Sequence, residues 1–91
     1  MKLSWDEAKR QRTLDARGLD FALADVVFNG VQFTREDLRR EYGERRFITA
    51  GFLEDRMVVV VWTPRGPVRH IISMRKANDR EQKAFKQTLE D

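Results

Sequence analysis

The residues best suited to bind an anion lie in one basic stretch in the second half of this 91-residue chain. A guanidinium is planar and can hold a phosphate through two hydrogen bonds at once. The stretch therefore favours a polyanionic partner, and nucleic acid is the commonest polyanion in a cytoplasm. A surface that only confers solubility would have the same composition. Residues 56–78 contain neither Asp nor Glu, and their cations are Arg56, Arg65, Arg69, Arg75 and Lys76.

Three further residues could move a proton or share in binding a phosphate. His70 is the only histidine of the chain, and an imidazole titrates close to neutral pH. It lies among apolar residues, so a hydrogen-bonded core histidine is an equally good interpretation. Glu44 and Arg46 are two residues apart at the start of a predicted strand, which places them on one face. They form either a proton acceptor beside a phosphate ligand or a simple surface ion pair.

Composition narrows the remaining classes of function. The chain has no cysteine and one histidine, which rules out a thiolate zinc site and a histidine metal cluster. No group of carboxylates suggests a magnesium site, so we expect no metal and no other cofactor. The N-terminal MKLSWDEAKR lacks the apolar run of a signal peptide, and no stretch approaches a membrane span. We expect one globular domain over residues 1–91, acting in the cytoplasm without a membrane.

Hydrophobic periodicity and turn residues predict eight elements. The short connections between the central strands indicate an antiparallel meander. The fold class is therefore α/β in the broad sense, of α+β type. We expect an antiparallel sheet of four to five strands, two N-terminal helices and a C-terminal helix, in the order β-α-α-β-β-β-β-α. The expected strands cover residues 2–5, 31–34, 46–53, 57–63 and 68–74, and the expected helices cover residues 7–16, 21–29 and 79–89.

Capping residues and alternation place particular side chains. Asp6, Asp20 and Asn78 are expected to cap the three helices, with Glu81 completing a capping box. Trp5 and Trp62 are more often core residues than platforms for a nucleic-acid base. Strict alternation along the last strand predicts two faces: Arg69, Ile71, Ser73 and Arg75 on one, and Val68, His70, Ile72 and Met74 on the other.

The segment HIISMRKA at residues 70–77, with Glu81 four residues beyond it, resembles the RIISARKA-x-x-x-E ending of the BrnT family. Further similarities follow in the family's order and span essentially the whole chain. They are Trp5-Asp6-Glu7 with Lys9, Gly18, Phe21, Ala24, Val27-Phe28, Gly43-Glu44, Arg46-Phe47, Gly51 and Arg65-Gly66.

The resemblance implies a RelE-like fold and the toxin of a type II toxin–antitoxin pair, which cleaves RNA and arrests translation. It also implies inhibition by a BrnA-type ribbon-helix-helix antitoxin, with operator DNA bound only through that partner. The chain departs from the family pattern at several polar positions. Ala16-Arg17 replaces Lys-His, Arg40 replaces a histidine, His70 replaces an arginine and Phe85 replaces a tyrosine.

RNA supplies its own nucleophile, the 2′-hydroxyl, so its cleavage requires a proton acceptor and cations around the phosphate. We expect Arg75 and Arg46 to stabilise the phosphorane and Glu44 or His70 to accept the proton. Lys76, Arg69, Arg65 and Arg17 are expected to bind RNA, although Arg17 could simply cap its helix. Two alternatives remain open: a module that binds RNA without cleaving it, and a structural subunit that is stable only in a complex.

Overall fold

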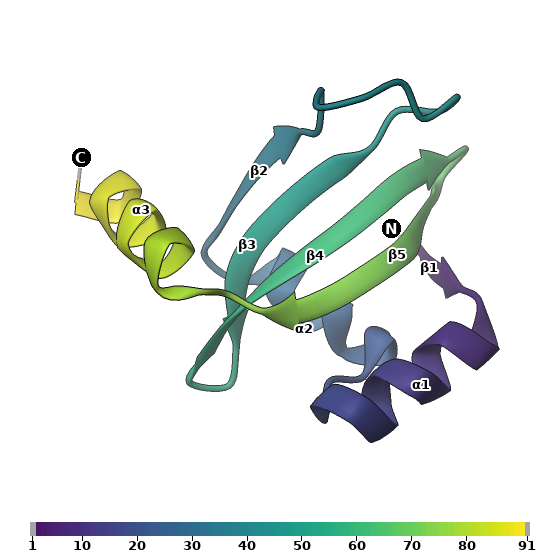
Figure 1. Cartoon of the computed structure of the whole chain (residues 1–91), viewed down its shortest axis with the longest axis horizontal. Helices are drawn as coiled ribbons and strands as arrows, with labels where there is room; N and C mark the ends of the chain where they lie inside the picture. Colours follow the sequence, from purple (N-terminus) through teal and green to yellow (C-terminus); the bar gives the residue numbers. More distant parts are fainter. Residues whose placement is uncertain (1, 91) are drawn as a thin grey trace.

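The structure is a computed structural model that describes residues 2–90. It has an α+β fold in which five strands form one mixed sheet, accompanied by three α-helices (Figure 1). A short 3₁₀ turn, η1, joins the first two helices. In chain order the elements are β1 (Lys2–Trp5), α1 (Glu7–Arg17), η1 (Phe21–Leu23), α2 (Ala24–Asn29), β2 (Gln32–Glu36), β3 (Phe47–Leu53), β4 (Arg56–Arg65), β5 (Val68–Lys76) and α3 (Asp79–Glu90).

The sheet has the strand order β1-β5-β4-β3-β2. Strands β2 to β5 form the antiparallel meander that their short connections predict. The expectation of a wholly antiparallel sheet is wrong at one edge, because β1 pairs with β5 in parallel. No tight turn joins β1 to β5, since the rest of the chain lies between them, and so no hairpin sets their relative direction.

A β-bulge interrupts the alternation of β5. Val61 of β4 pairs with Ser73, but the next residue, Trp62, pairs with Ile71, so Ile72 has no partner on β4. An additional residue of this kind shifts the side-chain alternation by one position. Ile71 and Met74 are consequently buried in the same core cluster. The predicted assignment of β5 side chains to faces is therefore wrong.

Two apolar clusters pack on opposite faces of the sheet. The larger cluster lies under η1 and α2 and includes Phe21, Val27 and Trp62. The second is smaller and joins Phe85 of α3 to Met57 and Val59 of β4. The interpretation of Trp62 as a core residue is confirmed, since it is 8% exposed and its Nε1 donates to the Thr49 hydroxyl at 2.9 Å.

The predicted caps of α1 and α3 are present, whereas Asp20 caps η1 and not α2, since its side chain accepts from the amide of Ala22 at 2.9 Å. The Asp6 side chain accepts from the amide of Ala8 at 2.9 Å, and Gly18 ends α1 in the left-handed region with φ 69°. Asn78 and Glu81 form a reciprocal capping box at the start of α3, with bonds of 2.8 and 2.9 Å. Within residues 2–90, no helix combines the length and apolar character that a membrane crossing requires.

The face of the sheet opposite η1 and α2 is only partly covered. In Figure 1, α2 lies behind the sheet, α3 stands at one end of the strands, and the loop of residues 37–46 lies near the other end. Ile48, Val61 and Ser73 are half-buried between these two boundaries. We call this surface, bounded by α3 and the 37–46 loop, the open face.

Candidate active site

His70 and Arg75 both project from β5 onto the open face. Their partners on β4 are Thr63 and Val59 respectively. These two β4 residues share a face with each other, because β4 alternates regularly and they are an even number of residues apart. Val59 belongs to the cluster beneath α3. The bulge at Ile72 thus brings together two candidate residues that strict alternation assigns to opposite faces.

His70 is held at its Nδ1 atom. The Ser4 hydroxyl lies 2.9 Å from Nδ1, across the parallel β1–β5 pair. The pKa of His70 lies below its ordinary value, first because burial penalises the charged imidazolium and second because Arg65 repels it, although Glu44 opposes the shift. His70 is therefore neutral near pH 7, with Nε2 not engaged by Ser4.

Glu44 lies between two arginines. One of its carboxylate oxygens is 3.8 Å from Nε of Arg46, and the other is 3.8 Å from a terminal nitrogen of Arg65. These separations exceed hydrogen-bonding distance, so both guanidinium groups keep donors available. Nε of Arg46 is buried and has no hydrogen-bond partner within residues 2–90. We refer to Glu44, Arg46, Arg65 and His70 as the Glu44 cluster.

The Glu44 cluster is anchored by a buried carboxylate that sequence reasoning missed. Asp37 is 4% exposed and accepts two bonds from the Arg39 guanidinium, at 2.8 and 2.9 Å. It also accepts from the Tyr42 hydroxyl at 2.8 Å, and its own amide donates to the Arg46 carbonyl at 2.8 Å. The paired Arg39 guanidinium holds the pKa of Asp37 far below its usual range, with help from Tyr42. Nothing in the loosely patterned 37–43 stretch marked this anchor.

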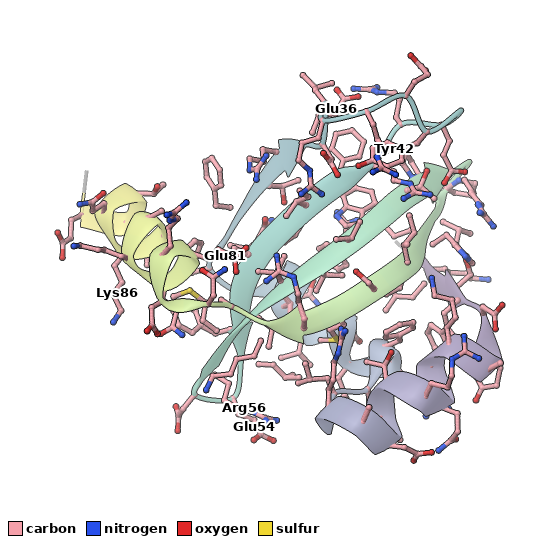
Figure 2. All side chains as sticks on the ribbon, in the orientation of Figure 1. Glu36, Tyr42, Glu54, Arg56, Glu81 and Lys86 are labelled. Atoms are coloured by element: carbon pink, nitrogen blue, oxygen red, sulfur yellow. The ribbon has the colours of Figure 1, made fainter. Side chains whose placement is uncertain are left out.

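Arg75 is fixed by Glu81, the capping-box residue of α3. Both terminal nitrogens of Arg75 bond the Glu81 carboxylate at 2.7 Å. This bidentate pair lowers the pKa of Glu81 to about 2. Arg75 thus has an acidic partner on α3, beyond the stretch of residues 56–78 that lacks Asp and Glu. Figure 2 shows Glu81 at the base of α3 beside the sheet, with Tyr42 in the loop at the far end.

Two of the other predicted RNA-binding residues, Arg69 and Arg17, make contacts within the protein. Arg69 faces the opposite side of the sheet from Arg75, with its guanidinium carbon 4.1 Å from the Phe28 ring centroid and 5.0 Å from that of Trp62. The expectation that Arg69 and Arg75 point the same way is wrong because of the bulge. Arg17 donates to the Met74 carbonyl at 3.0 Å, beyond the part of β5 that pairs with β1.

Arg17 nevertheless lies close to other cations. A hollow of about 350 Å³ next to the end of β5 is lined by four basic side chains and two apolar ones. No acidic residue is among those that line it. This basic hollow adjoins the open face through Arg75, and its lining residues are Arg17, Leu19, Arg56, Val58, Arg75 and Lys76.

Comparison with protein families gives one result for residues 5–81, which is most of the chain. These residues match a family model described as the ribonuclease toxin, BrnT, of type II toxin–antitoxin system. A search of curated proteins yields no match.

Proposed function

Because the chain belongs to the BrnT family of type II toxin–antitoxin ribonuclease toxins, we propose that it is an endoribonuclease that cleaves RNA on its open face without a metal. The observation that supports this most strongly is the convergence of four candidate residues on one surface. Arg46, Glu44 and His70 gather at one end, and Arg75 projects from the same face nearer to α3. This arrangement supplies a proton acceptor and guanidinium groups, the chemistry that RNA cleavage requires.

His70 is the proton acceptor that we favour. Its neutral imidazole can take the proton from a 2′-hydroxyl through Nε2, while the Ser4 hydroxyl fixes the ring through Nδ1. The 2′-oxygen then bonds to the adjacent phosphorus, and the bond from phosphorus to the 5′-oxygen breaks. The products are a 2′,3′-cyclic phosphate and a 5′-hydroxyl, the latter protonated from water.

Arg46 is placed to stabilise the charge of the phosphorane. Its guanidinium lies over the Tyr42 ring at 4.2 Å from the centroid, and its contact with Glu44 is loose. A preorganised donor of this type costs little reorganisation during the reaction. Glu44 keeps the two arginines from repelling one another before the substrate arrives.

Arg75 contacts the substrate at a distance from the Glu44 cluster. Arg46 immediately precedes Phe47, the partner of Trp62, whereas Arg75 pairs with Val59. The two arginines are therefore separated by about four residues of β4, or roughly 13 Å of strand. In this proposal the scissile phosphate lies at the Glu44 cluster, and a neighbouring phosphate is bound by Arg75 and by Lys76 of the basic hollow.

The biological setting follows from the family and from the resemblance in sequence. We propose a RelE-like toxin that arrests translation in the cytoplasm, with a BrnA-type ribbon-helix-helix antitoxin as its inhibitor. Operator DNA would be bound by the complex through the antitoxin. β2 is an edge strand of the sheet, and the exposed side chains of Phe33 on it and of Val31 just before it support a chain that acts alongside a protein partner.

The direct test is incubation of the purified protein with a defined RNA in EDTA. The proposal predicts cleavage with 2′,3′-cyclic phosphate ends, strongly reduced in Arg46→Ala. Tight RNA binding without cleavage, under the same conditions and in the presence of magnesium, would instead establish a non-catalytic RNA-binding module.

A further inference from the structure

The 37–46 loop forms a hollow beside the Glu44 cluster. Of the residues that line the hollow, only Arg46 belongs to that cluster. Its volume is about 390 Å³, which lies within the range of small-molecule sites. Its lining residues are Arg39, Arg40, Tyr42 and Arg46. Since Arg46 also contacts Glu44, the hollow opens next to the place where the scissile phosphate is proposed to lie.

The hollow presents a fixed aromatic ring. The Tyr42 hydroxyl donates to the buried Asp37 carboxylate, so the ring cannot turn freely and its hydroxyl is already engaged. The Arg46 guanidinium stacks 4.2 Å from the ring centroid, and the Arg40 guanidinium lies 6.0 Å from it. A rigid ring with planar cations around it is the type of platform on which an unstacked RNA base rests.

Hydrogen-bond donors predominate among the polar groups of the hollow, because three of its four lining side chains are arginines. The three arginines have donors and no acceptor, and Tyr42 directs its only hydroxyl proton to Asp37. Arg40 has no ion pair within residues 2–90. Guanidinium donors pair with a base edge that carries only acceptors, and the N7 and O6 atoms of guanine form such an edge. Adenine and cytosine would place an amino group against these donors.

We propose that the hollow of Arg39, Arg40, Tyr42 and Arg46 is a guanine-binding subsite, which selects a guanine next to the cleaved bond. This inference rests on the proposed ribonuclease function. Within the subsite Tyr42 supplies the stacking surface and Arg40 the bidentate contact. Asp37 is a positioning residue, because it acts by holding Tyr42 and Arg39.

The test separates binding from cleavage. Binding is measured by fluorescence anisotropy with short single-stranded RNAs in which every ribose is 2′-O-methylated, so that no nucleophile is present. One RNA has a single central guanine, and matched RNAs have adenine, cytosine or uracil in its place. The wild-type protein should bind the guanine RNA about tenfold more tightly than the adenine and cytosine RNAs.

Variants then connect the preference to the hollow. Tyr42→Leu and Arg40→Gln should each abolish the guanine preference, whereas Tyr42→Phe, which keeps the ring, should retain most of it. Arg40 is exposed and makes no ion pair in the described chain, so Arg40→Gln remains informative if Tyr42→Leu unfolds. Lys86→Ala, on α3, is the matched control and should bind all four RNAs as the wild type does.

The outcomes distinguish this proposal from the ribonuclease proposal. The subsite proposal is wrong if the wild type binds all four RNAs equally. It is also wrong if the guanine preference survives Arg40→Gln and Tyr42→Leu in folded protein. Either result overturns the subsite even if RNA is cleaved. A guanine preference lost in both variants, in a protein that cleaves no RNA, supports the subsite and rejects the enzyme. Sequencing of the cleavage products should show guanine beside the cut bonds.

Discussion

His70 and Arg75 share the open face of the sheet although they are five positions apart on β5. The relationship depends on the bulge at Ile72, which lets Ile71 pair with Trp62 and Ser73 pair with Val61. Without it, an odd separation would place the two side chains on opposite faces. The imidazole and the guanidinium can therefore act on one polymer strand that crosses β5.

The pH dependence of cleavage should follow the protonation of the His70 imidazole. Burial lowers its pKa, with Arg65 and Lys9 acting in the same direction and Glu44 and Asp6 opposing. The imidazole therefore stays unprotonated below its ordinary pKa of about 6.5, and the rate should fall only at lower pH.

The measurement is kcat/KM against pH for the wild type and His70→Asn. The variant should be slower and should lack the acidic limb. The His70 assignment fails if the acidic limb is unchanged in the variant, and Glu44 then becomes the proton acceptor.

Arg46 should contribute directly to the rate of the chemical step. Arg46→Ala is expected to lower kcat by about 10²–10³-fold, the usual cost of removing one preorganised donor. Arg45→Ala is the matched control, because Arg45 pairs with Glu36 at 3.0 Å and is not part of the Glu44 cluster. Equal losses in both variants would indicate general electrostatic attraction and would contradict the specific role of Arg46.

Two substitutions distinguish the role of Arg75 in toxicity from the role of its pairing with Glu81. Arg75→Ala should abolish growth arrest in cells, while the protein still folds and binds its antitoxin. Glu81→Gln keeps a side chain that can accept from the Asn78 amide and releases Arg75, so it should leave toxicity in place. A fully toxic Arg75→Ala protein would show that Arg75 serves only to hold α3.

The lowered pKa of Glu81 predicts that the folded protein loses stability at acidic pH. Its folded pKa is about 2, below the unfolded value near 4.5, because Arg75 bonds the carboxylate. The stabilisation is therefore complete above the unfolded value and is lost as pH falls towards 2. Thermal melting from pH 6 to pH 2 should show a smaller decrease in Glu81→Gln than in the wild type. Parallel curves would contradict the pairing.

α2 lies close against the sheet at Gly51. A β-carbon there would lie 2.8 Å from Cγ1 of Val27 and 3.3 Å from Cβ of Gln32. Gly51→Ala should lower the free energy of unfolding by about 1–3 kcal/mol, the usual cost of overpacking a core. In the double variant with Val27→Ala, the loss should be smaller than the sum of the two single losses. Strict additivity in denaturant titrations would show that the two positions do not touch.

Local signals predicted the parts of the fold that depend on short stretches of chain. The caps at Asp6 and Asn78 and the β2–β5 meander follow from residues close together in sequence. Longer-range features were not predictable in this way. The parallel pairing of β1, the bulge at Ile72 and the Glu81 partner of Arg75 each depend on how distant elements pack.

The candidate site shows the same division. Arg46 and Glu44 were predicted to be neighbours because they are two residues apart, and they make contact. His70 and Arg75 were each selected for their chemistry, but the bulge rather than alternation brings them onto one face. Asp37 was missed because an acidic residue in a charged loop is usually exposed, and only the folded loop buries it under Arg39 and Tyr42.

The central claim is that RNA is cut by its own 2′-hydroxyl on the open face. The most direct measurement uses an RNA in which one cleavage position has been mapped, remade with a single 2′-deoxy nucleotide on the 5′ side of that bond. The account predicts that cleavage at that bond disappears while cleavage at other bonds continues. Continued cleavage at the deoxy position would contradict it, because the nucleophile would then have to come from elsewhere.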